Sequence, residues 1–162
     1  MHACLGKLVV VSVVGFCLTH HPSEAVGSHY LIADVPDVIP AQYHVALGKA
    51  DIRNTQVLYQ KIAAKDGRSS LAKKTRIMYA TLTKWAAFLD LMQIDGVGPK
   101  MVRLLQASGV QNLLAFQKES ASALHPRMRS ANRGARYSEI LPSVAVVRGW
   151  IQRAKALPVT LE

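Results

Sequence analysis

The sequence predicts an all-α fold, a compact array of short helices in one domain. Half of the 162 residues are hydrophobic, while alternating strand patterns and Asn-Gly hairpin turns are scarce. A chain of this length supports a single hydrophobic core. We expect its helices to include tandem units of the helix-hairpin-helix type, the second well formed and the first degenerate.

Residues 1–25 have the composition of a signal peptide. Lys7 precedes the apolar run Leu8–Leu18, and the small residues Ser23 and Ala25 suit cleavage after Ala25. A lipid anchor on Cys17 is the lesser alternative, because a bulky residue precedes it. The apolar run is also shorter than the roughly 20 residues that cross a bilayer. We therefore expect an exported chain, periplasmic or secreted, that does not span a membrane.

Cleavage after Ala25 removes both cysteines and leaves the net charge of +10 unchanged, since Lys7 and Glu24 leave together. The mature chain is then expected to have no disulfide. Its positive charge favours polyanionic partners, such as nucleic acid, anionic lipid or acidic glycans.

Residues 26–36 predict an ordered lead-in that ends in a turn near Pro36, and residues 37–158 predict the helical domain. The pair Asp66-Gly67 and Gly109 suit turns or helix caps, and Pro142 suits the start of the last helix. Helices are expected at 40–49, 53–64, 68–76, 79–92, 99–108, 111–118, 120–124, 126–135 and 143–156.

The last predicted helix has an apolar face and should pack on the core. This face consists of Val144, Val147, Ile151 and Ala154. Trp85 and Trp150 also lie in helical segments, and we interpret both as core residues rather than as platforms that stack a ligand.

The chain resembles itself at an offset of 58 residues. Asp37, Ile39, Leu47, Ile52 and Asn54 align with Asp95, Val97, Leu105, Val110 and Asn112. Two related half-domains are one interpretation, and a chance similarity between two amphipathic helix pairs is the other.

The stretch Leu91–Leu105, LMQIDGVGPKMVRLL, predicts a helix-hairpin-helix turn. Gly96 and Gly98 permit positive φ angles and the close approach of another chain, while Val97 between them can turn inward. Pro99 then begins the second helix, where its missing N–H group has no cost. The alternative is that the glycines only allow a tight helix junction, which packs against protein.

In such a turn, the backbone N–H groups of Gly96, Gly98, Lys100 and Met101 lack partners at the positive end of a helix dipole. With the Lys100 ammonium beside them, they form a phosphate-sized anion site. Arg103, one turn further on, is expected to reach an adjacent phosphate. Contacts of this kind are independent of base sequence and strongly salt-dependent.

A set of segments from both halves also carries a family resemblance. They are Ile52-x-x-Thr55-x-x-Leu58, Arg68-Ser69-Ser70-Leu71-Ala72, Trp85–Leu91 with the hairpin after it, Leu104-Leu105-x-x-x-Gly109-Val110, and Trp150-Ile151-x-x-Ala154. In these segments, from about Tyr43 to Leu157, the chain resembles the helical proteins grouped as domain of unknown function 4332, which carry helix-hairpin-helix repeats. The resemblance implies paired hairpins and no established activity. At the hairpin alone, the chain more distantly resembles the DNA-binding repeats of repair proteins and of exported DNA receptors used in natural transformation.

The first half departs from the hairpin pattern. Val38-Ile39-Pro40 stands where the second half has Gly96-Val97-Gly98, and Asp37 is close by. Without a glycine, the first turn should not bind a phosphate. A single competent turn predicts weak binding to duplex DNA or none.

Four arginines form a basic run near the end of the chain, Arg127, Arg129, Arg133 and Arg136. With the basic residues of the segment 73–76, they are candidates to extend the surface that binds nucleic acid. The alternative is an ordinary solvated face.

The sequence has no recognisable catalytic motif. The histidines are too dispersed for a metal site, and no Gly-x-Ser-x-Gly elbow or phosphate-binding P-loop is present. We expect no enzyme activity, cofactor, metal or small-molecule substrate. Two hypotheses remain: sequence-independent binding of duplex DNA or another polyanion, and a protein-interaction or scaffold module of the cell envelope whose charge meets an acidic partner.

Overall fold

The computed structural model describes Gly27 and residues 29–162, so the predicted signal peptide and both cysteines lie outside the described residues. Within the described part, the chain is all-helical, as predicted. Its 3₁₀ and α-helices are η1 (Ile32–Asp34), η2 (Ala41–Tyr43), α1 (His44–Gly48), α2 (Thr55–Ile62), α3 (Lys65–Thr75), α4 (Tyr79–Met92), α5 (Pro99–Ala107), α6 (Leu113–Gln117), α7 (Ala121–Ala135) and α8 (Val144–Lys155).

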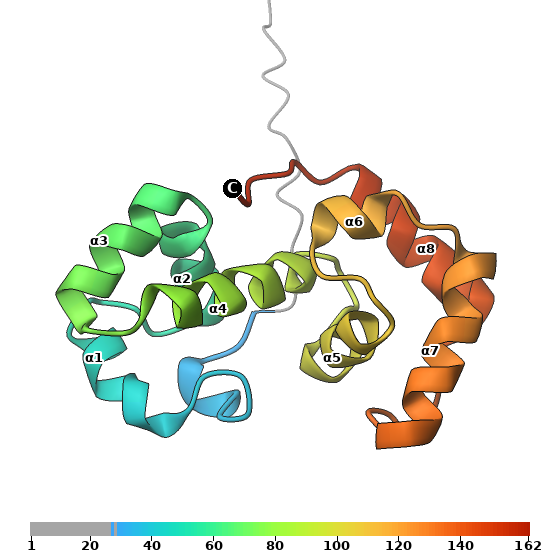
Figure 1. Ribbon diagram of the computed structural model, residues 1–162, viewed down its shortest axis with the longest axis horizontal. Helices are drawn as coiled ribbons and strands as arrows, with labels where there is room; N and C mark the ends of the chain where they lie inside the picture. Colours follow the sequence, from blue (N-terminus) through green and yellow to red (C-terminus); the bar gives the residue numbers. More distant parts are fainter. Residues whose placement is uncertain (1–26, 28) are drawn as a thin grey trace, which may run out of the picture.

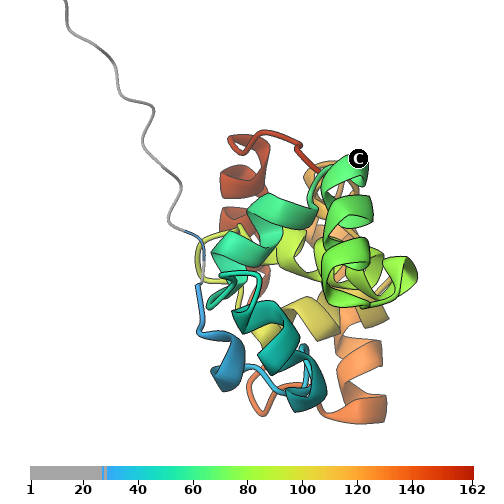
Figure 2. The same cartoon turned by 90° about the vertical axis from the view of Figure 1, so that its left-hand side faces the viewer.

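Helix α4 runs through the middle of the molecule, between α1–α3 and α5–α8 (Figure 1). It packs against α2 and α3 in the first half and against α5 and α6 in the second, while α8 packs on α6 and α7. Figure 2 views the molecule from the side of α1–α3. None of the described helices combines the length and the apolar character that a bilayer crossing needs.

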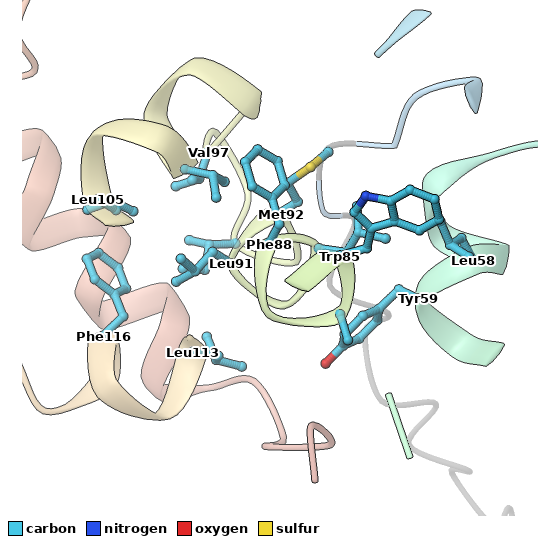
Figure 3. Packing of buried hydrophobic residues seen from close by; sticks show 14 of the residues in the cluster. Leu58, Tyr59, Trp85, Phe88, Leu91, Met92, Val97, Leu105, Leu113 and Phe116 are labelled. Atoms are coloured by element: carbon cyan, nitrogen blue, oxygen red, sulfur yellow. The ribbon is translucent and has the colours of Figure 1, made fainter. Parts of the chain in front are cut away.

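The hydrophobic core is continuous along α4 (Figure 3). Leu58 of α2 and Trp85 lie toward the first half, whereas Leu91 lies among buried residues of the second half, including Leu105 and Phe116. Trp85 is buried, as the sequence predicts. The loop between α4 and α5 is therefore attached, through Val97, to the same core that joins the two halves.

Helix α8 has the predicted apolar face. Val147, Ile151 and Ala154 are buried and Val144 is half-buried, so one stripe of the helix faces the core. Trp150 is buried on the same helix, which confirms its prediction as a core residue.

The pair Asp66-Gly67 does not form the predicted turn or cap, because both residues lie in the first turn of α3. Gly67 is required there for space: a Cβ on it would lie 2.1 Å from the carbonyl oxygen of Lys61. The end of α2 thus approaches α3 too closely for a side chain. Asp66 is compatible with this position because the helix dipole favours an acid in the first turn.

Pro126 does not divide a helix either. The helices predicted at 120–124 and 126–135 form the single helix α7, with Pro126 inside it. Proline removes the hydrogen bond to the carbonyl four residues earlier, here that of the exposed Ser122. Water can solvate that carbonyl, so the helix continues. The predicted helix 40–49 differs in a smaller way, since its first turn is the 3₁₀ helix η2.

Positions 58 residues apart share local structure. Asn54 and Asn112 each cap a helix, with their side chains accepting hydrogen bonds from backbone nitrogens three residues ahead, at 2.8 and 2.9 Å. Asp51 and Gly109 have positive φ angles of 60° and 91°. The aligned pairs Ile39 and Val97, Leu47 and Leu105, and Ile52 and Val110 are all buried. Shared caps and shared φ signs are more specific than a common amphipathic pattern.

A buried acid links the two halves. The carboxylate of Asp90 on α4 accepts hydrogen bonds from Tyr59 Oη of α2 at 2.5 Å and from the Leu113 backbone nitrogen of α6 at 2.7 Å. Burial raises the pKa of Asp90 above its ordinary value, and the two hydrogen bonds partly oppose that rise. Burial likewise raises the pKa of Tyr59.

The segment after α8 returns to the first half, where the chain end lies near α2 and α3 (Figure 1). Tyr59 Oη lies 2.8 Å from Thr160 Oγ1, and the Glu162 nitrogen donates to the Ala63 carbonyl at 3.1 Å. The buried Arg68 donates to the Glu162 carbonyl and to two carbonyls at the end of α2. This guanidinium thus joins the returning segment to α2.

Candidate nucleic-acid interface

The loop between α4 and α5 is a tight turn fixed from inside by one side chain. Val97 is fully buried, and its backbone nitrogen donates to the Ile94 carbonyl at 3.0 Å. Figure 3 shows Val97 beside Leu105 and Leu91. Gly96 has a φ of +80°, as the sequence predicts. A Cβ on Gly96 would also lie 3.1 Å from Trp150 Nε1, so the loop lies against α8.

Gly98 does not have the positive φ that we predicted. It is the N-cap of α5, with φ −91° and ψ 178°, an extended conformation open to any residue. Its nearest neighbour is the end of a flexible side chain, since a Cβ would lie 3.0 Å from the Tyr30 hydroxyl oxygen. Pro99 follows as the first residue of α5, as predicted.

The start of α5 carries backbone donors that the helix itself does not use. Among the described residues, none accepts a hydrogen bond from the backbone N–H groups of Gly96, Gly98, Lys100 or Met101. The Lys100 side chain is exposed beside them. The first amides of a helix lack partners within it and lie at the positive end of its dipole. This arrangement is suited to bind a phosphate group. We call these four residues the hairpin site.

A pocket of about 390 Å³ adjoins the hairpin site. Residues 98–101 form one side, residues 34–38 form the other, and Tyr30 completes the lining. The segment that leads into the first-half turn therefore lies next to the second-half turn. Ile32 and Val35, both buried, hold the lead-in segment in this place.

The pocket also contains negative charge. Asp34 and Asp37 are exposed residues of its lining. Arg103, predicted to reach a phosphate, instead lies 3.4 Å from Asp37 Oδ2 through its Nη2 atom. Both side chains are partly solvated, so this ion pair contributes little stability and can exchange for another partner.

Arg127 lies at the other end of α5. Its Nη1 donates to the Ser108 carbonyl at 2.9 Å, and its Nη2 contacts Glu119 Oε2 at 2.5 Å. Ser108 is the C-cap of α5, whereas the hairpin site is at the N-terminus of that helix. Nine residues of α-helix span about 14 Å. The structure thus separates Arg127 from the hairpin site and gives it acceptors within the protein.

The other arginines of the basic run gather elsewhere. Arg129, Arg133 and Arg136 line a pocket of about 520 Å³ at the end of α7, together with Ser138 and Glu139 of the following loop. The residues predicted to bind nucleic acid therefore fall into three groups: the hairpin site with Arg103 nearby, Arg127 alone, and the arginines at the end of α7.

The sequence did not predict that part of the lead-in lies next to the hairpin site. Tyr30 and Asp34 line the pocket although they precede the hairpin by more than sixty residues. Contacts over such a separation leave no periodic pattern. The available indication was the spacing of Ile32 and Val35, two apolar residues three positions apart that predict one buried helical turn.

Comparison with protein families gives one match. The family model described as "Domain of unknown function (DUF4332)" matches residues 38–157. Comparisons with curated proteins and with solved structures found no significant match. The matched range begins at Val38 and ends just beyond α8, so it includes the hairpin site but not the lead-in residues 30–37 that line the other side of the pocket.

Proposed function

Because the chain belongs to the DUF4332 family, whose description assigns no activity, we propose from its own residues that it is a non-enzymatic protein that binds duplex DNA. In this proposal, phosphates bind at the hairpin site, without reading the base sequence. The observation that carries the proposal is the set of backbone N–H groups at the hairpin site, for which the described residues offer no acceptor, beside the exposed Lys100 side chain.

The proposal includes a duplication of the helix-hairpin-helix unit. The matching caps at Asn54 and Asn112 support it, as do the positive φ angles at Asp51 and Gly109. In the first unit, Pro40 aligns with Gly98 and lacks an N–H group. One unit thus offers a full set of donors and the other an incomplete set, which predicts weak, strongly salt-dependent binding.

The experiment is a titration of residues 26–162 with labelled duplex of random sequence at several salt concentrations. Removing one phosphate contact should lower the slope of log affinity against log salt by about 0.9, so we expect Lys100→Ala to lower it by that amount. Lys118→Ala removes the same charge from the exposed C-cap of α6, outside the pocket lining, and should leave the slope unchanged. Equal effects of the two variants would contradict the proposal.

Gly98→Ala tests the backbone donors. The extended backbone at this position accepts alanine, and the added Cβ meets only the flexible end of Tyr30, so the fold should persist. The methyl group would obstruct the approach of a phosphate to the neighbouring N–H groups, and duplex affinity should fall. Unchanged affinity in a variant with a wild-type circular dichroism spectrum would refute the contact between amides and phosphate.

A second function is favoured by the charges in the pocket. Asp34 and Asp37 repel a phosphate, and Val35 and Met101 add apolar surface to the lining. These features suit a protein-interaction or scaffold module of the cell envelope, in which the hairpin is structural and the basic surface meets an acidic partner. Absence of duplex binding at low salt by the folded chain would favour this function.

We also propose that the protein acts outside the cytoplasm, as a periplasmic or secreted protein. The support is the order of Lys7, the apolar run Leu8–Leu18 and the small residues Ser23 and Ala25. Fractionation of cells and mass measurement of the purified chain test this. A full-length chain that stays in the cytosol would contradict export.

A further inference from the structure

The loop between α7 and α8 contains an exposed isoleucine, Ile140. The Asn132 side chain fixes this loop, because its Nδ2 donates to the Ser138 carbonyl at 2.9 Å and its Oδ1 accepts from the Ser138 nitrogen at 3.0 Å. Ser138 Oγ then donates to the Ile140 carbonyl at 2.8 Å. Ile140, two residues further on, is 82% exposed. The apolar side chain is thus displayed by a segment that the protein itself orders.

Three arginines lie next to the same loop. Arg129 and Arg133 are four residues apart and share one face of α7, and Arg136 is the C-cap that follows the helix. They line the pocket of about 520 Å³ that the loop completes. Within the described part of the chain, none of the three forms an ion pair, although Glu139 lines the same pocket. Their mutual repulsion is relieved when an anion binds.

We propose that this corner, formed by Arg129, Arg133, Arg136 and Ile140, docks on the surface of an anionic lipid bilayer. The guanidinium groups bind lipid phosphates, and Ile140 enters the boundary between headgroups and acyl chains. The exposed isoleucine favours lipid over nucleic acid, because a phosphate backbone offers no apolar environment for it whereas a bilayer does.

The corner is distinct from the hairpin site. It lies at the free end of α7, at the edge of the molecule away from α1–α3 (Figure 1). Arg127, the member of the run nearest to α5, is bound to Ser108 and Glu119 and so does not join the corner to the hairpin. The lipid contact therefore stands independently of the proposed binding of DNA.

The test reads the environment of position 140 directly. The full chain carries Cys4→Ser and Cys17→Ser together with Ile140→Cys, which is labelled with the polarity-sensitive dye bimane. A local signal is needed because the apolar run Leu8–Leu18 can attach any full-length variant to vesicles. We expect a blue shift of the emission on vesicles of equal parts phosphatidylglycerol and phosphatidylcholine, and a much smaller one on phosphatidylcholine alone.

The matched position is Val45 of α1, which is 69% exposed but lies in the other half of the molecule. A dye on Val45→Cys should show no shift. Replacing the three corner arginines with glutamine should weaken the partition of position 140 into anionic vesicles about 100-fold, at roughly fivefold per basic residue. The same charge change at three exposed lysines of the first half should preserve most of the shift; these are Lys49, Lys65 and Lys73.

Three results would overturn the lipid assignment. The first is no shift at position 140 on anionic vesicles, and the second is an equal shift on neutral vesicles. The third is a shift caused by duplex DNA but not by vesicles, which would assign the corner to nucleic acid instead.

Discussion

Replacing Asp37 with asparagine should strengthen duplex binding at the hairpin site. Asp37 lines the pocket beside this site and pairs with Arg103 at 3.4 Å. The substitution keeps the size of the side chain, removes a negative charge that faces the bound phosphate, and frees the Arg103 guanidinium. An increase in duplex affinity is informative, because a variant with a damaged fold would lose affinity instead.

The size of the gain follows from the ion pair and from counterion release. The Asp37 side chain is 77% exposed, so its pair with Arg103 contributes at most about 1 kcal/mol and the variant should fold normally. One added phosphate contact makes the slope of log affinity against log salt steeper by about 0.9. Over a fourfold change in salt, the gain should therefore change about 3.5-fold and be largest at low salt.

Fluorescence anisotropy of a labelled duplex measures this gain at low and moderate salt. Asp51→Asn is the matched control, because Asp51 is an exposed acid of the first half outside the pocket lining. It changes the net charge by the same amount and should alter the slope little. Equal slopes for wild-type protein and Asp37→Asn, or the same steepening in both variants, would refute the release of Arg103.

Two further predictions concern the framework that holds the site. Asp90→Ala removes the acceptor of Tyr59 and Leu113 and should lower the free energy of unfolding in urea by about 2–5 kcal/mol; Asp90→Asn keeps an acceptor oxygen and should cost less. Because the folded-state pKa of Asp90 is raised, the folded protein binds more protons than the unfolded chain above the ordinary carboxyl pKa. The stability that Asp90 contributes is therefore complete at low pH and declines as pH rises through the raised pKa. Over this pH range, the difference in the free energy of unfolding between wild type and Asp90→Asn should narrow. A difference that widens would contradict this prediction. Gly96→Ala places a side chain at a φ of +80° and should lower the free energy of unfolding by about 1–2 kcal/mol. The control is Gly134→Ala, inside α7 with open space around it, which should raise the free energy of unfolding by about 0.5–1 kcal/mol. Equal effects of the two substitutions would disprove the role of φ.

Local patterns predicted the helices that depend on local forces. Helix α4 has the predicted bounds, 79–92, and α5 begins at Pro99 as predicted, because proline is favoured at the first position of a helix. The wrong assignments at Asp66-Gly67 and Pro126 have a common cause. In each case a residue that usually breaks a helix is tolerated for a reason set by three-dimensional surroundings, a close carbonyl for Gly67 and an exposed one for Pro126.

The candidate site was predictable only in part. Gly96, Val97 and Pro99 adopt the local roles that the sequence predicts. The pairing of Arg103 with Asp37 joins residues 66 positions apart, and no local pattern encodes such a contact. The role of the buried Asp90 was not predictable either, because its hydrogen-bond partners Tyr59 and Leu113 belong to two other helices. Charge and hairpin pattern thus located the donors, but the fold determines which of them are free.

The most direct test of phosphate binding at the hairpin site is a nuclear magnetic resonance titration of nitrogen-15-labelled protein with a short random-sequence duplex at low salt. The proposal predicts that the backbone amide signals of Gly98, Lys100 and Met101 shift most, saturate with duplex, and return as salt is added. Signals that stay in place at these three residues, while the duplex binds elsewhere or not at all, would contradict it.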